Sequence, residues 1–220
     1  MILYGSSVSP FVRKVLVVAR EKGIDLELRP AGMGRGGPEF DEASPFRKMP
    51  ALRDPGADHG RDFLLCDSTA IVTYLEAKFP EPAMIPAEPM ARARTIWFEE
   101  FGDTIVAATG GRIVFNRLVA PKVLKIAGDE AVAAKAHVEE VPPLLDYLEG
   151  VARPGGFLVG DALTVADIAV ASPFATMAHA GVTIDAARWP NAAGYIAAIL
   201  ARPSFADLIA VEQRMMAAMA

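Results

Sequence analysis

The sequence predicts an α/β domain over residues 1–80 and an all-α domain over residues 90–220, joined by a linker at residues 81–89. Short apolar runs alternate with helical patterns in the first part, as in sheets that contain parallel strands. Prolines are dense between positions 80 and 89, which is typical of an interdomain linker. Beyond this segment the longer patterns all have helical periodicity.

The first domain is expected to have the element order βαβαββα. Strands are indicated at residues 2–4, 26–29, 51–53 and 63–66, and helices at 11–22 and 68–79, with a weak helical turn near Phe40. Turn-forming residues at positions 54–60 indicate a long loop that joins the last two strands into an antiparallel hairpin.

The second domain is expected to contain helices at residues 92–115, 138–151, 164–180 and 191–200. The first of these has apolar residues at helical spacing, namely Ile96, Trp97, Phe101 and Ile105. Thr164 and Asp167 form a capping box at the start of the third, with Leu163 and Ile168 as its hydrophobic staple. This motif is structural and carries no chemistry.

Composition limits the classes of partner. The 220-residue chain is 52% hydrophobic and 22% charged, and its net charge of −5 argues against nucleic-acid or anionic-membrane partners. Cys66 is the only cysteine, so no internal disulfide can form, which fits a reducing cytoplasm. There is no basic and apolar leader and no apolar run of about 18 residues, so we expect neither export nor a membrane span. The three histidines are far apart in the sequence, so we expect no metal site.

Ser9-Pro10-Phe11 places a hydroxyl at the start of the first helix. The unpaired N–H groups and the macrodipole at such a position stabilise an anion by about 0.3 to 2 kcal/mol, which would benefit a bound thiolate. Serine followed by proline is also the ordinary N-cap and N1 pair of a helix without any ligand. The residues themselves leave both interpretations open.

Two further motifs lie beside predicted elements of the first domain. If the Met49-Pro50 bond is cis, the Met49 backbone can face outward and pair with an extended peptide ligand. Asp67-Ser68 either caps the next helix or takes a carboxylate on the helix N–H groups and an ammonium on Asp67. The second arrangement would hold the zwitterionic end of an amino acid.

Gly32, Gly34 and Gly37 match the glycine pattern of a dinucleotide-binding turn. That pattern belongs after the first strand and opens a long helix, whereas here it follows the second strand, and Pro38 and Pro45 leave little room for one. A flexible glycine loop is the better interpretation.

Four segments resemble the cytosolic glutathione transferases, and the first of them resembles especially the serine-type members of the tau and phi classes. They are LYGSSVSPFVRKVLVVAREKGIDLE at residues 3–27, KMPAL at 48–52, DSTAIVTYLEAKFP at 67–80 and VGDALTVADIAVA at 159–171. The resemblance covers essentially the whole chain. It implies a thioredoxin-like N-terminal domain followed by an all-α C-terminal domain, in agreement with the pattern of elements.

The resemblance also implies roles for single residues toward glutathione. Ser9 matches the serine that hydrogen-bonds the sulfur, and Asp67, in place of the more usual Glu, matches the residue that with Ser68 holds the γ-glutamyl end. Lys48 falls where some members of the family contact the glycine carboxylate. Met49 matches the residue whose backbone pairs with the cysteinyl part of glutathione, and Pro50 matches the family's cis-proline.

The acceptor pocket is the least legible part of the sequence. The family's acceptor region corresponds to five positions here: Val12, Ala107, Gly111, Arg112 and Phe115. It is equally possible that Ala107 and Gly111 are small only to let helices pack. Cys66 is expected to be a buried and inert strand residue.

The resemblance implies a homodimeric enzyme that conjugates glutathione, its co-substrate, to small hydrophobic electrophiles without a metal. Reduction of organic hydroperoxides by the same site is a second possibility. A non-catalytic binding or regulatory protein with the same fold is a third, although the presence of Ser9 argues against it.

Overall fold

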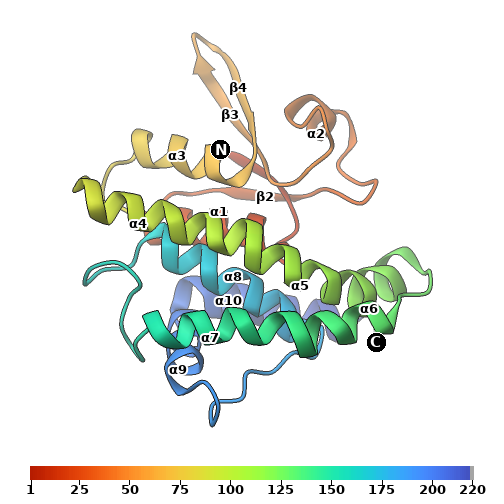
Figure 1. Cartoon of the computed structure of the whole chain (residues 1–220). Coiled ribbons are helices and arrows are strands. Elements are labelled where there is room, and N and C mark those ends of the chain that lie inside the picture. Colours follow the sequence, from red (N-terminus) through yellow and green to blue (C-terminus); the bar gives the residue numbers. More distant parts are fainter. Residues whose placement is uncertain (219–220) are drawn as a thin grey trace. The chain divides into compact units, whose positions relative to one another are not determined.

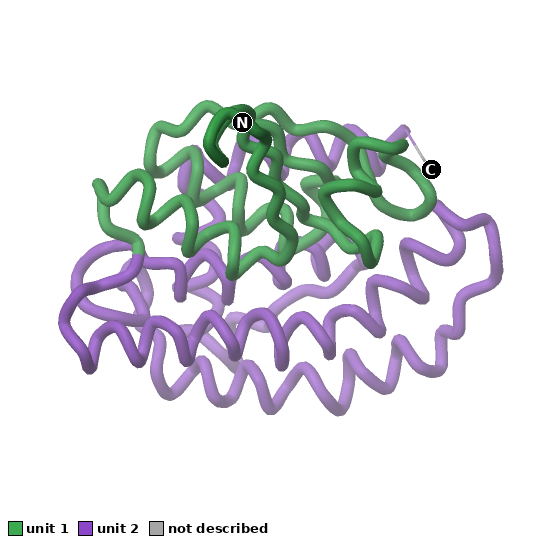
Figure 2. Tube along the Cα trace, turned by 90° about the horizontal axis from the view of Figure 1, so that it is seen from above, with its two compact units in different colours: residues 1–84 green, residues 85–220 purple. Residues whose placement is uncertain are grey.

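The computed structural model describes residues 1–218 of the chain (Figure 1). It divides into two compact units, residues 1–84 and 85–220, which Figure 2 shows in green and purple. The first unit is α/β, and all the regular elements among the described residues of the second are helices, so the predicted fold class is confirmed. The boundary between them lies within the proline-rich segment.

The first unit has the predicted element order. Its elements are β1 (Ile2–Gly5), α1 (Pro10–Glu21), β2 (Glu27–Pro30), α2 (Gly37–Ala43), β3 (Ala51–Asp58), β4 (Arg61–Cys66) and α3 (Ser68–Lys78). The sheet order is β2-β1-β3-β4, with β1 parallel to β2 and antiparallel to β3, and β3 antiparallel to β4. Consequently β1, β2 and β4 end, and β3 begins, at one edge, which we call the carboxyl edge.

The two faces of this sheet carry different helices because side chains alternate along each strand. On one face, Asp54 and Phe63 contact Tyr74 of α3. On the other face, α2 packs Phe40 and Ala43 into a cluster with residues of the strands and of the segment after β2, namely Tyr4, Ala31 and Ala51. In Figure 1, α2 and α3 accordingly lie on opposite sides of the β3–β4 hairpin.

The long loop expected between β3 and β4 is absent from the hairpin, so that prediction is wrong. Strand β3 continues through Pro55 and Gly56 to Asp58, so the turn consists only of His59 and Gly60, both with positive φ. The pairing with β4 is irregular between residues 54 and 58, as in a bulge. Because β1 pairs with β3 only up to residue 53, the missing N–H of Pro55 removes no hydrogen bond from that ladder.

The second unit is built around one buried helix. Its elements are α4 (Pro89–Glu100), η1 (Phe101–Val106), α5 (Ala107–Val114), η2 (Phe115–Leu124), α6 (Glu130–Lys135), η3 (Ala136–Glu140), α7 (Val141–Val151), α8 (Val165–His179), α9 (Pro190–Leu200) and α10 (Pro203–Ala217), where η denotes a π-helix. Thirteen consecutive residues of α8 are buried. Helices α4, α5, α9 and α10 all pack against α8.

The first long helix is buried on a different face from the one its apolar spacing indicates. Of the four apolar residues that indicate it, only Phe101 is buried, whereas Trp97 and its two isoleucine neighbours in the pattern are substantially exposed. The buried face instead follows Thr95, Phe98 and Glu99. Two of these residues are polar, so apolar periodicity cannot reveal that face.

Two helical segments extend beyond the sequence expectations. The helix expected at 138–151 begins at residue 130, because α6 and α7 are continuous through the π-helical segment η3. Helix α10 has no counterpart among the expected helices. Among residues 1–218, no single helix has the length and apolar character needed to cross a membrane, although the bent pair α9–α10 would pass on those two criteria.

The predicted capping box at the start of α8 is confirmed and extends into a buried hydrogen-bond centre. One oxygen of Asp167 accepts hydrogen bonds from the Thr164 backbone at 2.9 Å and hydroxyl at 3.2 Å. The other accepts from the Leu158 N–H at 2.8 Å and the Tyr195 hydroxyl at 2.9 Å. Burial raises the pKa of Asp167 although these hydrogen bonds act in the opposite direction.

Replacement of Asp167 by Ala is expected to lower the free energy of unfolding by about 3 kcal/mol, because buried donors lose their acceptor. Chemical denaturation measures this loss. Asp161→Ala is the matched control, since Asp161 is an exposed acid in the preceding loop. Equal stability of the two variants would contradict a structural role for Asp167.

Candidate active site

Three segments that are distant in the sequence meet at the carboxyl edge. The loop that carries Ser9 follows β1, the segment that ends at Pro50 precedes β3, and Asp67 follows β4. The N–H of Asp67 donates to the carbonyl of Pro50 at 3.3 Å, which joins two of these segments. Lys14 in α1 donates to the Thr69 hydroxyl at 3.1 Å, which connects the start of α1 with the start of α3.

Ser9 is the N-cap residue of α1, yet its side chain makes no capping hydrogen bond. Its N–H donates to the Ser6 carbonyl at 2.9 Å and its own carbonyl accepts from Arg13 at 2.9 Å, so the backbone is held on both sides. Within residues 1–218 the Ser9 hydroxyl has no hydrogen-bond partner. It is therefore available to a ligand at the helix N-terminus.

The surroundings of Ser9 favour a negatively charged ligand. Helix α1 has 12 residues, begins with Pro10 and has no acidic residue in its first turn. The positive end of its macrodipole is therefore not neutralised from within that turn. An anion bound beside the Ser9 hydroxyl would gain from this field and from a charge-assisted hydrogen bond.

The Met49-Pro50 bond is cis, and the backbone of Met49 is not used by the sheet. Neither its N–H nor its C=O has a hydrogen-bond partner within residues 1–218. Two unpaired groups on one residue match the donor and acceptor of an extended peptide. Lys48, the preceding residue, is exposed.

Two residues that shape this segment were missed by the sequence analysis. The Ser44 hydroxyl accepts from the Lys48 N–H at 3.0 Å and donates to the Lys48 carbonyl at 2.7 Å, which closes the turn before Met49. Gly32, with φ of 92°, leaves room for Met49, since a Cβ atom there would lie 2.8 Å from the Met49 sulfur. The glycine after β2 therefore has a packing role. Neither contact has a local sequence signal.

Asp67 caps α3, as one of its two interpretations expected. Its Oδ1 atom accepts from the N–H groups of Thr69 at 2.9 Å and Ala70 at 3.1 Å. These two groups are therefore already satisfied, which corrects the expectation that they receive a ligand carboxylate. Asp67 remains exposed and has a φ of 83°, a left-handed conformation that concentrates at functional sites. Ser68, the next residue, is buried.

Cys66 is half-buried at the end of β4, not fully buried as expected. It pairs with Ala51 across the sheet and lies against the core cluster beneath α2. Its position at an edge where the ladder ends explains its residual exposure.

The five residues expected around an acceptor pocket are divided between the two units. Val12, in α1, is completely buried and lies against Gly5, where a Cβ atom would be 2.5 Å from a Val12 methyl group. Its side chain supports the loop before Ser9 and lines no open pocket, contrary to expectation. The other four lie on α5 or at the start of η2.

Gly111 and Arg112 behave differently from each other. A Cβ atom at Gly111 would meet no other atom within 4 Å, so close helix packing does not explain this glycine. That role belongs to Gly102, where a Cβ atom would lie 2.6 Å from the α8 backbone. Arg112 pairs with Glu140 at 2.8 Å, so its charge is already engaged.

The other two positions expected in the pocket are Ala107, which is half-buried, and Phe115, which is substantially exposed.

Within residues 1–218 no group of three or more His, Cys, Asp or Glu side chains is arranged to hold a metal ion.

Comparisons with known proteins agree on one family. The family models described as glutathione S-transferase N-terminal domain and C-terminal domain match residues 3–83 and 129–198. Glutathione S-transferase 3 of Zea mays is 33% identical over 214 residues, which are 94% of this chain and 92% of that protein.

Two solved structures extend this similarity to the fold. A glutathione S-transferase from Rhodospirillum rubrum has a TM-score of 0.81 at 27% identity, covering 94% of this chain and 90% of the other. One from Methylobacterium radiotolerans, in complex with glutathione sulfonate, has a TM-score of 0.74 at 26% identity, covering 94% and 93%.

Ser9 makes no capping hydrogen bond, whereas Asp67 makes two, so substitutions at these residues should change the free energy of unfolding by different amounts. Ser9→Ala is expected to change the free energy of unfolding by no more than about 0.5 kcal/mol, because no capping hydrogen bond is lost. Asp67→Ala is expected to lower it by about 1 kcal/mol or more, because both capping bonds disappear and Ala tolerates positive φ poorly. Urea denaturation compares the two, and an equal loss would mean that Ser9 caps α1 in solution.

Proposed function

Because the chain belongs to the glutathione S-transferase family, we propose that it conjugates glutathione to small hydrophobic electrophiles, with Ser9 as the catalytic residue. The observation that carries the proposal is the unused Ser9 hydroxyl at the positive end of α1. A thiolate is the anion that such a position would stabilise in a protein of this family.

The groups at the carboxyl edge fit the parts of glutathione. The Ser9 hydroxyl would donate to the sulfur, and the unpaired Met49 backbone beside cis-Pro50 would pair with the cysteinyl residue. The exposed Asp67 carboxylate would take the γ-glutamyl ammonium, with Ser68 beside its carboxylate. Lys48 would reach the glycine carboxylate. The relative from Methylobacterium radiotolerans was solved in complex with glutathione sulfonate, which supports glutathione as the ligand of this chain.

The chemistry supplied by glutathione is attack of its thiolate on an electrophilic carbon, which forms a carbon–sulfur bond after the thiol proton has passed to solvent. With an aryl halide the carbon–halogen bond breaks and halide leaves. With an enone the carbon–carbon double bond opens and the resulting enolate takes a proton from solvent. A hydroxyl donor and a helix N-terminus together lower a thiol pKa by about two units, which raises the thiolate fraction at pH 7 from about 3% to about three-quarters. A less basic thiolate is also less nucleophilic, so its rate constant for attack falls about six- to tenfold. This offsets most of the roughly 25-fold gain in thiolate fraction. Most of the rate must therefore come from holding the electrophile close to the sulfur.

For the electrophile, we propose that Ala107, Gly111 and Phe115 contribute a roomy, partly aromatic surface. The open space at Gly111 supports this assignment. Val12 is withdrawn from it because it is completely buried, and Arg112 would have to leave Glu140 to contact an anionic substrate. A homodimer is the assembly we propose, as is usual in this family.

Ser9→Ala is expected to lower kcat/KM with an aryl halide about two- to fivefold at pH 6.5, because the bound thiol ionises less when only the helix N-terminus lowers its pKa. The difference should narrow as the pH rises through the ordinary range of a thiol. Steady-state kinetics across pH measure this, with Ser6→Ala as the matched control in the same loop. Identical pH profiles for the wild type and Ser9→Ala would remove Ser9 from the mechanism.

Substrate class is tested by incubating the protein with glutathione and a panel of aryl halides, enones and organic hydroperoxides. Conjugates are expected with the first two groups, detected by mass spectrometry. Failure to bind immobilised glutathione, together with the absence of a glutathione-dependent thermal shift, would contradict the proposed function.

A further inference from the structure

Helix α2 precedes the segment at residues 44–50 that carries Met49 and cis-Pro50. This helix cannot be stable alone. It has only seven residues, whereas isolated helices need about 12 to 15 to be even marginally stable in water. Glycines at positions 32, 34, 36 and 37, all with positive φ, precede or begin it. Its position on the sheet must therefore come from tertiary contacts.

The apolar contacts of α2 are few. Phe40 and Ala43 are its buried residues, and only Phe40 is large. They belong to a small apolar cluster with Tyr4 and Ala51, on the face of the sheet that α2 covers. Polar contacts at the margins of this cluster are therefore a substantial part of what holds α2 in place.

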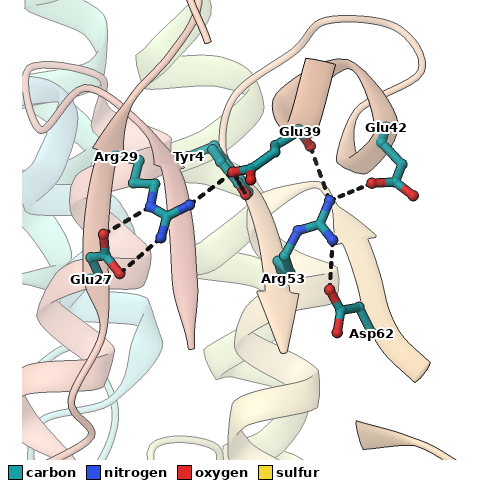
Figure 3. Close-up of polar contacts among 7 residues, drawn as sticks. All are labelled: Tyr4, Glu27, Arg29, Glu39, Glu42, Arg53 and Asp62. Atoms are coloured by element: carbon teal, nitrogen blue, oxygen red, sulfur yellow. Dashed lines mark hydrogen bonds and ion pairs between the residues drawn. The ribbon is translucent and has the colours of Figure 1, made fainter. Parts of the chain in front are cut away.

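Arg53 makes several of these polar contacts (Figure 3). Its Nη2 atom lies 2.5 Å from Glu42 Oε2 of α2, and its Nη1 atom lies 2.6 Å from Asp62 Oδ2 of β4. Nη2 also reaches the Glu39 carbonyl at 3.5 Å. The Arg53 side chain is only 13% exposed, so its charge is poorly screened by solvent. One guanidinium thus joins α2 to two strands.

A second contact on the other side of α2 is weaker. Glu39 Oε2 accepts from Arg29 at 2.8 Å and from the Tyr4 hydroxyl at 3.2 Å (Figure 3). Glu39 and Glu42 are equally exposed, at 61%, but Arg29 is 39% exposed whereas Arg53 is 13% exposed, so the Arg29 pair is screened more strongly by solvent. Arg53 is therefore the residue whose loss should release α2.

The consequence of α2 docking reaches the site through a short chain of contacts. The Ser44 N–H donates to the Phe40 carbonyl at 2.8 Å, so Ser44 is fixed directly at the end of α2. The Ser44 hydroxyl holds both backbone groups of Lys48. Met49 follows at once, so the position of its unpaired backbone depends on where α2 ends.

We propose that Arg53 is a positioning residue for glutathione, which acts through Glu42 by keeping α2 docked so that the Met49 backbone is presented at the carboxyl edge. The proposal rests on the proposed function, because it takes Met49 as a glutathione contact. Undocking lowers the fraction of molecules that can bind, and the apparent dissociation constant rises in inverse proportion to that fraction. Ser9 lies on a different segment, so turnover at saturating glutathione stays unchanged.

The test compares Glu42→Gln with Asp58→Asn in the full-length protein. Both variants replace one carboxylate by an amide, but within residues 1–218 the ion pair of Asp58 is with Arg61, at 2.7 Å in the hairpin, and not with a residue of α2. Glu42→Gln is expected to raise the glutathione Kd, measured by calorimetry, and the KM about three- to tenfold. Asp58→Asn should leave both near the wild-type values, and kcat should change in neither variant.

Hydrogen exchange of the α2 amides provides a readout that does not depend on activity. Glu42→Gln should accelerate exchange at residues 40–43, whereas Asp58→Asn should not. A double-mutant cycle with Arg53→Met completes the test, because Glu42→Gln should have little further effect once Arg53 is absent. If Arg53→Met does not fold, Glu42→Gln alone decides the matter, since Glu42 is 61% exposed.

The possible outcomes separate this proposal from the proposed function. A wild type that does not bind glutathione contradicts the function itself, and the positioning role falls with it. A wild type that binds, with Glu42→Gln binding equally well, overturns only the positioning role. Faster exchange in α2 without a change in glutathione affinity would also overturn it, because the contact would then be merely structural.

Discussion

The register of β1 in the sheet is the constraint on which the rest of the first unit depends. Because β1 runs parallel to β2 and antiparallel to β3, with Tyr4 opposite both Arg29 and Ala51, the connections before β3 and after β1, β2 and β4 emerge at one edge. Ser9 and Asp67 lie 58 positions apart in the chain and reach this edge only through that pairing. A shift of one residue in the pairing of β1 would also turn each of its side chains to the opposite face of the sheet.

At this edge the chain departs from local rules that it follows elsewhere. Ser9 occupies a cap position without capping, Met49 leaves two backbone groups unpaired, and Asp67 adopts a positive φ. By contrast, Asp167 in the second unit satisfies four donors at once and makes its capping box purely structural. Local departures that persist in a folded protein concentrate where function requires them, and here they coincide with the residues that we propose to contact glutathione.

Local signals in the sequence account for the parts that were predicted correctly. Alternating patterns and turn residues define the order βαβαββα, and Thr164 with Asp167 marks the start of α8. The prediction failed where distant residues decide the outcome. Tertiary packing buries the polar face of α4 at Thr95 and Glu99, and two of the four buried residues of α10, Ser204 and Glu212, are also polar. For the same reason neither Ser44 nor Arg53 could be recognised, because their roles come from contacts that only the fold creates.

The proposed function requires the Ser9 hydroxyl and the start of α1 to stabilise the thiolate of bound glutathione. Titration of glutathione bound to the protein, followed by the ultraviolet absorbance of the thiolate, measures this directly in the wild type and in Ser9→Ala. We expect a thiol pKa about two units below the ordinary value near 8.5 in the wild type, and a return toward that value in Ser9→Ala with glutathione still bound. The same thiol pKa in both proteins would contradict it.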